Sequence, residues 1–179
     1  MKLAINFAAD GVLPQCRVLV VGHDAETVSK YYECATSLGY DIDAAQTPAE
    51  ALQRLAQDHN IGVVIVDLEM PVGGLAFLDE LGARFSLLRP VVPIAVSADD
   101  SLANVVEAMR TNARDFLTKP VGADVLSGAL RRATRAWQDL YAGFRLAAAV
   151  RRDAPATPIG DAPAPPPAAA DEREGLLAQ

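Results

Sequence analysis

The chain has 179 residues, 51% of them apolar, which is enough for one domain of ordinary size with appendages. A formal net charge of −7 argues against nucleic acid or an anionic membrane surface as a partner. The two cysteines, Cys16 and Cys34, lack metal-finger spacing, so we expect neither a disulfide framework nor a zinc module. The sequence has no secretory signal and no apolar run of about 18 residues, so we expect a cytoplasmic protein without a membrane span.

The first predicted elements are a strand, a helix and a second strand, preceded by a loosely attached arm over residues 1–15. Val18–Val21 is an apolar strand. The helix covers residues 25–38 and ends at Gly39. Residues 40–45 then form a half-buried strand. The apolar side of the helix is expected to consist of Val28, Tyr31, Tyr32 and Leu38.

A second helix and a central strand follow. Thr47-Pro48-Ala49-Glu50 predicts a helix start, with Thr at the N-cap, Pro at the first helical position and Glu three residues after the cap. The next strand, Val63–Asp67, has four apolar residues that indicate burial on both faces. It ends on a carboxylate, and Pro71 stops the strand from continuing. Ligands gather at the carboxyl ends of strands in open parallel sheets, so Asp67 is a candidate site residue.

The alternation continues beyond this strand. The remaining elements before the last helix are predicted as a helix over 75–85, a strand over 91–96, a helix over 101–111 and a strand over 115–118. Pro93 is unusual for a central strand. We expect Asp99 or Asp100 to cap the helix that starts near residue 101, and Asn112 to end it in a left-handed conformation.

The last helix is predicted over residues 123–151 and is unusually long. Its apolar positions follow a 4-3-4-3-4-3 spacing and are Leu126, Leu130, Ala133, Trp137, Leu140, Phe144 and Ala147. The first half is expected to pack on the sheet, so that residues 16–137 form one domain. The seam on the extension, residues 138–152, either meets a partner chain or folds back. Residues 153–179 are rich in proline and alanine and are expected to be a disordered acidic tail.

Five strands alternating with five helices predict an α/β fold. We expect a doubly wound five-stranded parallel sheet of the flavodoxin-like order 2-1-3-4-5, with an extended C-terminal helix. In that order Asp67 faces Gly22-His23-Asp24, while Ser97 and Lys119 reach the same rim. A carboxylate nucleophile beside an ammonium and a hydroxyl, both of which stabilise anionic oxygens, indicates a phosphoryl-binding site.

Four motifs occur in register with these strand ends: Val18-Leu19-Val20-Val21, Val66-Asp67-Leu68-Glu69-Met70-Pro71, Val96-Ser97-Ala98, and Phe116-Leu117-Thr118-Lys119-Pro120. With them, residues 16–137 resemble the receiver domain of bacterial two-component response regulators. The resemblance implies that Asp67 is the phosphoacceptor, and that Ser97, Lys119 and Phe116 are phosphoryl-binding and switch residues. It also implies a histidine kinase or phosphotransfer protein as phosphodonor and a downstream protein as partner.

The chain departs from the family pattern where receivers hold Mg²⁺, because Gly22 and His23 replace the usual acidic pair. Asp67 and Asp24 are left as a weak candidate metal site, and Mg²⁺, which prefers oxygen ligands, is expected to bind weakly if at all. His23 is a rim histidine, a charge partner for Asp67 or a soft-metal ligand. Glu69 is either a solvated loop acid or a residue that tunes phosphoryl lifetime.

Three functions follow. The first is a stand-alone, non-enzymatic receiver in a phosphorelay that switches protein–protein interactions through Asp67 phosphorylation, with impaired Mg²⁺-dependent transfer. The second is a phosphorylation-independent pseudo-receiver that serves as an interaction module, with a possible homodimer formed through the C-terminal helix. The third, a flavodoxin-like cofactor-binding enzyme, is disfavoured because no phosphate-loop motif occurs.

Overall fold

The computed structural model describes residues 14–71, 73–85 and 89–153. The expectations for the N-terminal arm, apart from its last two residues, and for the tail beyond residue 153 lie outside the described residues. Within the described part of the chain, none of the helices is long and apolar enough to cross a membrane.

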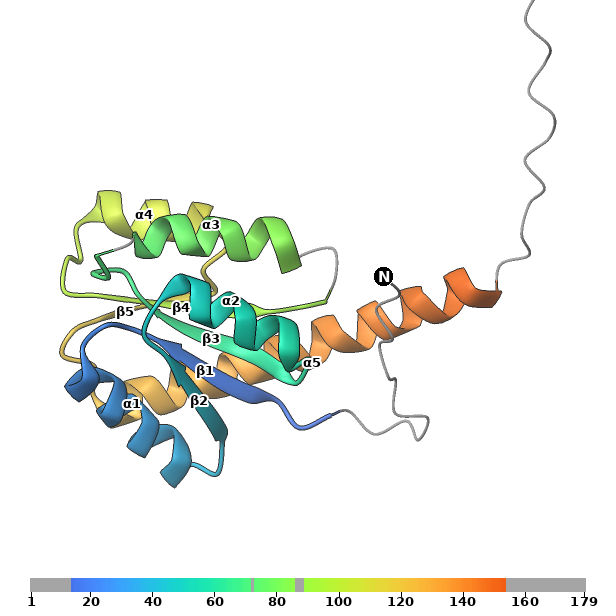
Figure 1. Ribbon diagram of the computed structural model, residues 1–179, viewed down its shortest axis with the longest axis horizontal. Coiled ribbons are helices and arrows are strands. Elements are labelled where there is room, and N and C mark those ends of the chain that lie inside the picture. The colour runs from blue at the N-terminus through green and yellow to red at the C-terminus, as the bar shows by residue number, and fades with distance from the viewer. Residues whose placement is uncertain (1–13, 72, 86–88, 154–179) are drawn as a thin grey trace, which may run out of the picture.

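One parallel sheet forms the centre of the domain, with the predicted strand order β2-β1-β3-β4-β5 (Figure 1). Its strands are β1 (Arg17–Val21), β2 (Asp41–Ala45), β3 (Ile61–Asp67), β4 (Val92–Ser97) and β5 (Asp115–Thr118). β3 lies between β1 and β4, and the register sets Asp67 opposite Val96 of β4. The predicted flavodoxin-like fold is therefore confirmed.

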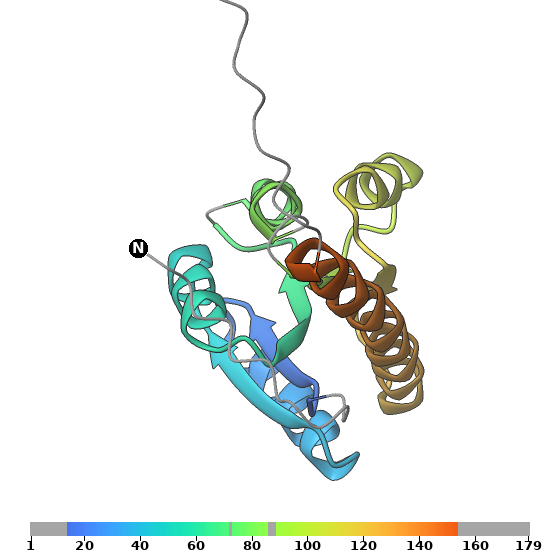
Figure 2. The same ribbon diagram turned by 90° about the vertical axis from the view of Figure 1, so that its right-hand side faces the viewer.

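Helices cover both faces of the sheet, as the alternation of elements predicts. They are α1 (Ala25–Ser37), α2 (Pro48–Gln57), α3 (Gly74–Phe85), α4 (Leu102–Arg110) and α5 (Ala123–Asp153). α1 and α5 lie on one face, and α2, α3 and α4 on the other (Figures 1 and 2). Each face has its own apolar core.

The burial of β3 explains why its sequence is apolar at every position before Asp67. All seven residues of β3 are buried. Val63 and Ile65 pack in the core under α1 and α5, whereas Val64 and Val66 pack in the core under α2 and α3. A strand covered on both faces must be apolar at every position, and the first polar side chain, that of Asp67, comes where this cover ends.

Two of the predicted helix ends are confirmed and one is wrong. The Thr47 hydroxyl accepts a hydrogen bond from Glu50 N (3.2 Å) at the start of α2, and Asn112 after α4 has a φ of 67°. The N-cap of α4 is Ser101, not Asp99 or Asp100. The Asp99 carboxylate accepts a hydrogen bond from Ser101 N (2.9 Å) and so stabilises the turn before the helix. Ser101 Oγ accepts a hydrogen bond from Asn104 N in the first turn of α4, which makes Ser101 the cap.

The buried stripe of α1 is narrower than predicted. Tyr31 and Ala35 are buried, but Tyr32 and Leu38 are 44% and 42% exposed. Val28, Tyr31 and Ala35 follow the i, i+3, i+7 spacing that faces the sheet, and Tyr32 lies on the flank of that stripe. α1 covers the edge of the sheet near β2, where there is too little surface to bury a wider stripe.

The first half of α5 packs on the sheet as predicted, with Leu126, Leu130, Ala133 and Trp137 buried. Trp137 Nε1 donates to the Pro90 carbonyl (3.1 Å), and its ring lies over Gly62 of β3, where a Cβ atom would be 2.4 Å from Nε1. Beyond Trp137 the helix runs past the sheet (Figure 1), and Leu140 is 55% exposed.

Candidate functional site

The carboxyl ends of β3, β4 and β5 form a rim on which the predicted site residues lie. Asp67, the last residue of β3, is 3% exposed. Leu68 N donates to the Val96 carbonyl (2.8 Å) and Lys119 N to the Ser97 carbonyl (2.8 Å), so backbone hydrogen bonds extend the strand pairing into the rim. This continuation holds the three strand ends in fixed register and fixes where their side chains start.

Lys119 links two carboxylates at the rim. Its ammonium Nζ lies 2.8 Å from Asp67 Oδ1 and 2.8 Å from Glu69 Oε2. Partial burial works to lower the pKa of Lys119, but the hydrogen bonds to Asp67 and Glu69 outweigh it and the pKa is raised. Lys119 is therefore a stable cation next to the most buried carboxylate of the rim.

Glu69 joins the rim through both of its carboxylate oxygens. Oε2 accepts from Lys119, while Oε1 accepts from the backbone N–H of Ala98 at 2.6 Å. Glu69 N in turn donates to Asp67 Oδ1 (3.0 Å). The Lys119 hydrogen bond is the main cause that lowers the pKa of Glu69, so this side chain is an anion at neutral pH. The Glu69 side chain is 39% exposed, and both roles predicted for it stay predictions.

Ser97 reaches the rim but faces α4. It is 1% exposed, and its Oγ accepts from Asp99 N (3.0 Å) and from Asn104 Nδ2 (3.2 Å). Phe116 is half-buried and packs against the core on the α2, α3 and α4 face, away from the charged cluster. Asn104 was not identified from the sequence, although its place three residues after the Ser101 cap would put it on the first turn of α4.

The residues after β1 take three different positions. Gly22 is closest to the acceptor: a Cβ atom there would be 3.4 Å from Asp67 Cβ and 3.7 Å from Asp67 Oδ2. His23 is exposed. Asp24 is the N-cap of α1, where its carboxylate accepts from Glu26 N (3.3 Å), Thr27 N (3.1 Å) and the Thr27 hydroxyl. These hydrogen bonds, chiefly those from Thr27, lower the pKa of Asp24.

This donor set fits Mg²⁺ poorly. The ion takes oxygen ligands in near-octahedral geometry, usually one or two protein carboxylates together with waters. Asp67 Oδ1 is bound by Lys119, the Asp24 carboxylate serves its own helix, and Gly22 adds no side-chain oxygen. Among residues 14–71, 73–85 and 89–153, no group of three or more His, Cys, Asp or Glu side chains is arranged to hold a metal ion.

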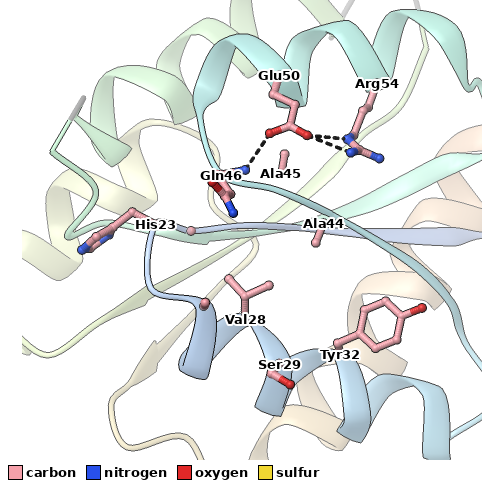
Figure 3. Close-up of a pocket in the computed structure, with 11 residues that line it drawn as sticks. His23, Val28, Ser29, Tyr32, Ala44, Ala45, Gln46, Glu50 and Arg54 are labelled. Carbon is pink, nitrogen blue, oxygen red and sulfur yellow. Dashed lines mark hydrogen bonds and ion pairs between the residues drawn. The ribbon is translucent and has the colours of Figure 1, made fainter.

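A cavity of about 470 Å³ lies beside the rim, between α1 and α2 (Figure 3). It shares Gly22 and His23 with the rim but does not include Asp67. Its charged groups are already paired, since Arg54 binds Glu50 (2.7 Å) and Glu50 also accepts from Gln46 N (2.9 Å). The predicted site at Asp67 and Lys119 therefore lies outside this cavity.

Comparison with known proteins identifies the family. The family model for the response regulator receiver domain matches residues 18–131. The transcriptional regulatory protein KdpE of Mycobacterium tuberculosis is 35% identical over 119 residues, which are 66% of this chain and 50% of KdpE. ZraR of Escherichia coli K12 is 30% identical over 65% of this chain and 26% of its own length. The chain thus spans half or less of the length of these curated relatives.

Solved structures agree as well. The signal receiver domain of a putative LuxO repressor protein from Vibrio parahaemolyticus superposes with a TM-score of 0.63 at 25% identity, covering 70% of this chain and 94% of that one. A CheY-like receiver domain protein from Methanospirillum hungatei shares the fold, with a TM-score of 0.62 at 20% identity, covering 70% of this chain and 99% of that one.

Proposed function

This chain belongs to the response regulator receiver domain family, and from that membership and the geometry of the rim we propose that it is a signalling module controlled by phosphorylation of Asp67. Receiver domains interact with histidine kinases and with downstream effectors. We propose the same two kinds of partner for this chain, a histidine kinase or phosphotransfer protein as donor and a protein effector as target.

The observation that carries the proposal is the buried carboxylate of Asp67 held 2.8 Å from the Lys119 ammonium. In the transfer, a carboxylate oxygen of Asp67 attacks the phosphorus of a phosphohistidine or of acetyl phosphate. The bond from phosphorus to the donor breaks, the donor keeps the electron pair, and Asp67 becomes an acyl phosphate. Lys119 stabilises the negative charge that accumulates on the phosphoryl oxygens.

Transfer is expected to be slow, because the residues after β1 do not supply the oxygen ligands that Mg²⁺ needs. A divalent cation would otherwise neutralise the phosphoryl oxygens as the bond to the donor breaks. In this chain Lys119 is expected to supply most of that charge neutralisation. In the predicted metal pair of Asp67 and Asp24, the ion would compete for Asp24 oxygens that already accept hydrogen bonds from Thr27 N and Glu26 N.

The proposed output runs from Ser97 to α4. Ser97 Oγ accepts two hydrogen bonds from the α4 side and keeps its own proton to donate. A phosphoryl group on Asp67 offers new acceptor oxygens, so the hydroxyl is expected to turn toward it and loosen its contact with Asn104. Phe116, on the same face as α4, is the residue expected to repack in response.

A phosphorylation-independent role is the second candidate, and the apolar extension of α5 favours it. Leu140 is 55% exposed and Phe144 is partly exposed, four residues further along the seam. We propose that a second copy of the chain pairs there. Replacing Leu140 and Phe144 by Glu should convert a dimer to a monomer in sedimentation experiments, whereas a monomeric wild-type protein would rule the pairing out. These substitutions spare Trp137, which the domain needs in its core.

The phosphoacceptor proposal is tested by incubating the protein with acetyl phosphate and following its intact mass. A time-dependent gain of one phosphoryl group is expected for the wild type, and none for Asp67→Asn. Asp100→Asn, which removes one acidic charge from an exposed position on the next loop, is the matched control and should label like the wild type. No adduct on the wild type, under conditions that label an ordinary receiver, would favour the phosphorylation-independent role.

A further inference from the structure

We propose that the Glu69 carboxylate is a built-in anion that occupies the donors on which the phosphoryl group of Asp67 would be held. The proposal rests on the proposed function in one respect, namely that the displaced ligand is a phosphoryl group. It assigns Glu69 the role of an internal competitor for small tetrahedral anions at this rim.

Although Glu69 lies at the surface, its two oxygens are held as those of a bound anion are. Its two oxygens accept from an ammonium, that of Lys119 at 2.8 Å, and from a backbone amide, that of Ala98 at 2.6 Å. The amide comes from a loop 29 positions away in the sequence. Charge-assisted bonds of this kind to backbone N–H groups are how proteins hold phosphate and carboxylate groups.

Glu69 is also held next to the acceptor. Its backbone N–H donates to Asp67 Oδ1 (3.0 Å), the same oxygen that binds Lys119. A phosphoryl group attached to Asp67 would therefore lie within reach of Lys119 and of the Ala98 amide. To accept the single N–H of Ala98 it must replace the Glu69 carboxylate, and at Lys119 it competes with Glu69 and Asp67 for the ammonium.

The charges of the cluster favour displacement of Glu69. Lys119 is one positive charge between two carboxylates, so the cluster of Asp67, Glu69 and Lys119 already carries an excess negative charge. The phosphoryl group carries about −1.5 to −2 at neutral pH, and because the Asp67 carboxylate loses its own charge on phosphorylation, the cluster gains roughly −0.5 to −1. The Glu69 side chain is 39% exposed and can turn outward into solvent when that charge arrives. Until then the Glu69 carboxylate keeps the Ala98 N–H hydrogen-bonded to an anion although Asp67 carries no phosphoryl group.

The test is a titration of the ¹⁵N-labelled full chain with inorganic phosphate, followed by the amide signals of Ala98 and Glu69. In Glu69→Ala the Ala98 amide loses its internal partner and Lys119 keeps only Asp67, so we expect saturable shifts with a half-saturation concentration about tenfold or more below that of the wild type. Glu69→Gln keeps the shape but not the charge and should be intermediate. Asp100→Ala removes a nearby charge without opening the donors and should behave like the wild type. Adding Lys119→Met to Glu69→Ala should abolish binding.

Two results would overturn the proposal: wild type and Glu69→Ala binding phosphate equally well, or neither binding it while both spectra show a folded protein. If Glu69→Ala is unfolded, Glu69→Gln serves in its place with the same two criteria. The titration involves no phosphoryl transfer, so it succeeds or fails independently of whether Asp67 can be phosphorylated. Conversely, absence of labelling by acetyl phosphate in both the wild type and Glu69→Ala counts against the proposed function alone.

Discussion

Restoring an acidic residue at Gly22 tests whether this position controls the charge around Asp67. A Cβ atom at Gly22 would lie 3.7 Å from Asp67 Oδ2 and 3.2 Å from Val28 Cγ2. Gly22→Asp therefore combines a tight contact with Val28 and a second carboxylate beside Asp67. Gly22→Asn produces the same contact without the charge and is the matched control.

The electrostatic part can be estimated from this geometry. With roughly 5 Å between the two carboxylates and an effective dielectric constant near 20, the repulsion is about 3 kcal/mol, and the nearby Lys119 reduces it. Gly22→Asp should then be about 1–3 kcal/mol less stable than Gly22→Asn in the absence of divalent cations. Saturating Mg²⁺ should remove that difference, since a ligand at about 100 times its Kd stabilises the folded state by about 2.7 kcal/mol.

The assay is urea unfolding of the wild type and both variants, with EDTA and with Mg²⁺. The reasoning is refuted if the two variants are equally stable in EDTA, because the new side chain would then not face Asp67. It is also refuted if Mg²⁺ stabilises the wild type as much as Gly22→Asp, because the native residues would then already bind the ion.

Three further predictions concern stability. Gly62→Ala should lower the free energy of unfolding by about 2 kcal/mol because its Cβ would overlap the buried Trp137 ring. The double variant with Trp137→Phe should lose less stability than the sum of the two single losses, and strictly additive losses would contradict this. Arg89, 5% exposed, donates to the carbonyls of Leu55, Asp58, His59 and Ile61. Arg89→Met should therefore cost about 3 kcal/mol in urea unfolding, whereas the same change at the exposed Arg110 should cost less than about 0.5 kcal/mol. The folded-state pKa of Glu69 lies below its usual 4.5; its stabilising contribution is thus present above pH 4.5 and lost as the pH falls through the lower folded value, so the advantage of the wild type over Glu69→Gln should vanish in acid. An advantage that persists at the lowest pH would contradict this.

Most of the fold could be predicted because its local signals agree with its topology. The apolar run that ends at Asp67 predicts a strand buried on both faces. The Thr47-Pro48 pair predicts a helix that starts with Thr47 as its cap. The start of α4 could not be predicted in detail. Asp99, Asp100 and Ser101 are all good capping residues, and the backbone turn after β4, which the sequence does not specify, decides among them.

The site could be predicted only as far as strand ends locate it. Asp67 and Ser97 are the last residues of their strands and Lys119 directly follows β5, so strand order brings them to one rim. The bond from Ala98 to Glu69 could not be predicted, because it uses a backbone N–H that every residue except proline has and joins two loops whose separation depends on the packed fold. Asp24 is predicted as a weak metal ligand, and that stays a prediction; the structure adds that it is the N-cap of α1, where it accepts from Thr27 N.

The central claim is that the carboxylate beside Lys119 receives the phosphoryl group. It is tested most directly by treating the protein with acetyl phosphate, reducing the acyl phosphate with borohydride, and mapping the modified residue by peptide mass spectrometry. We predict modification at Asp67, slowed in Lys119→Met and accelerated by Mg²⁺ in Gly22→Asp. Modification at any other aspartate, or none at Asp67 when an ordinary receiver is labelled in parallel, would contradict the claim.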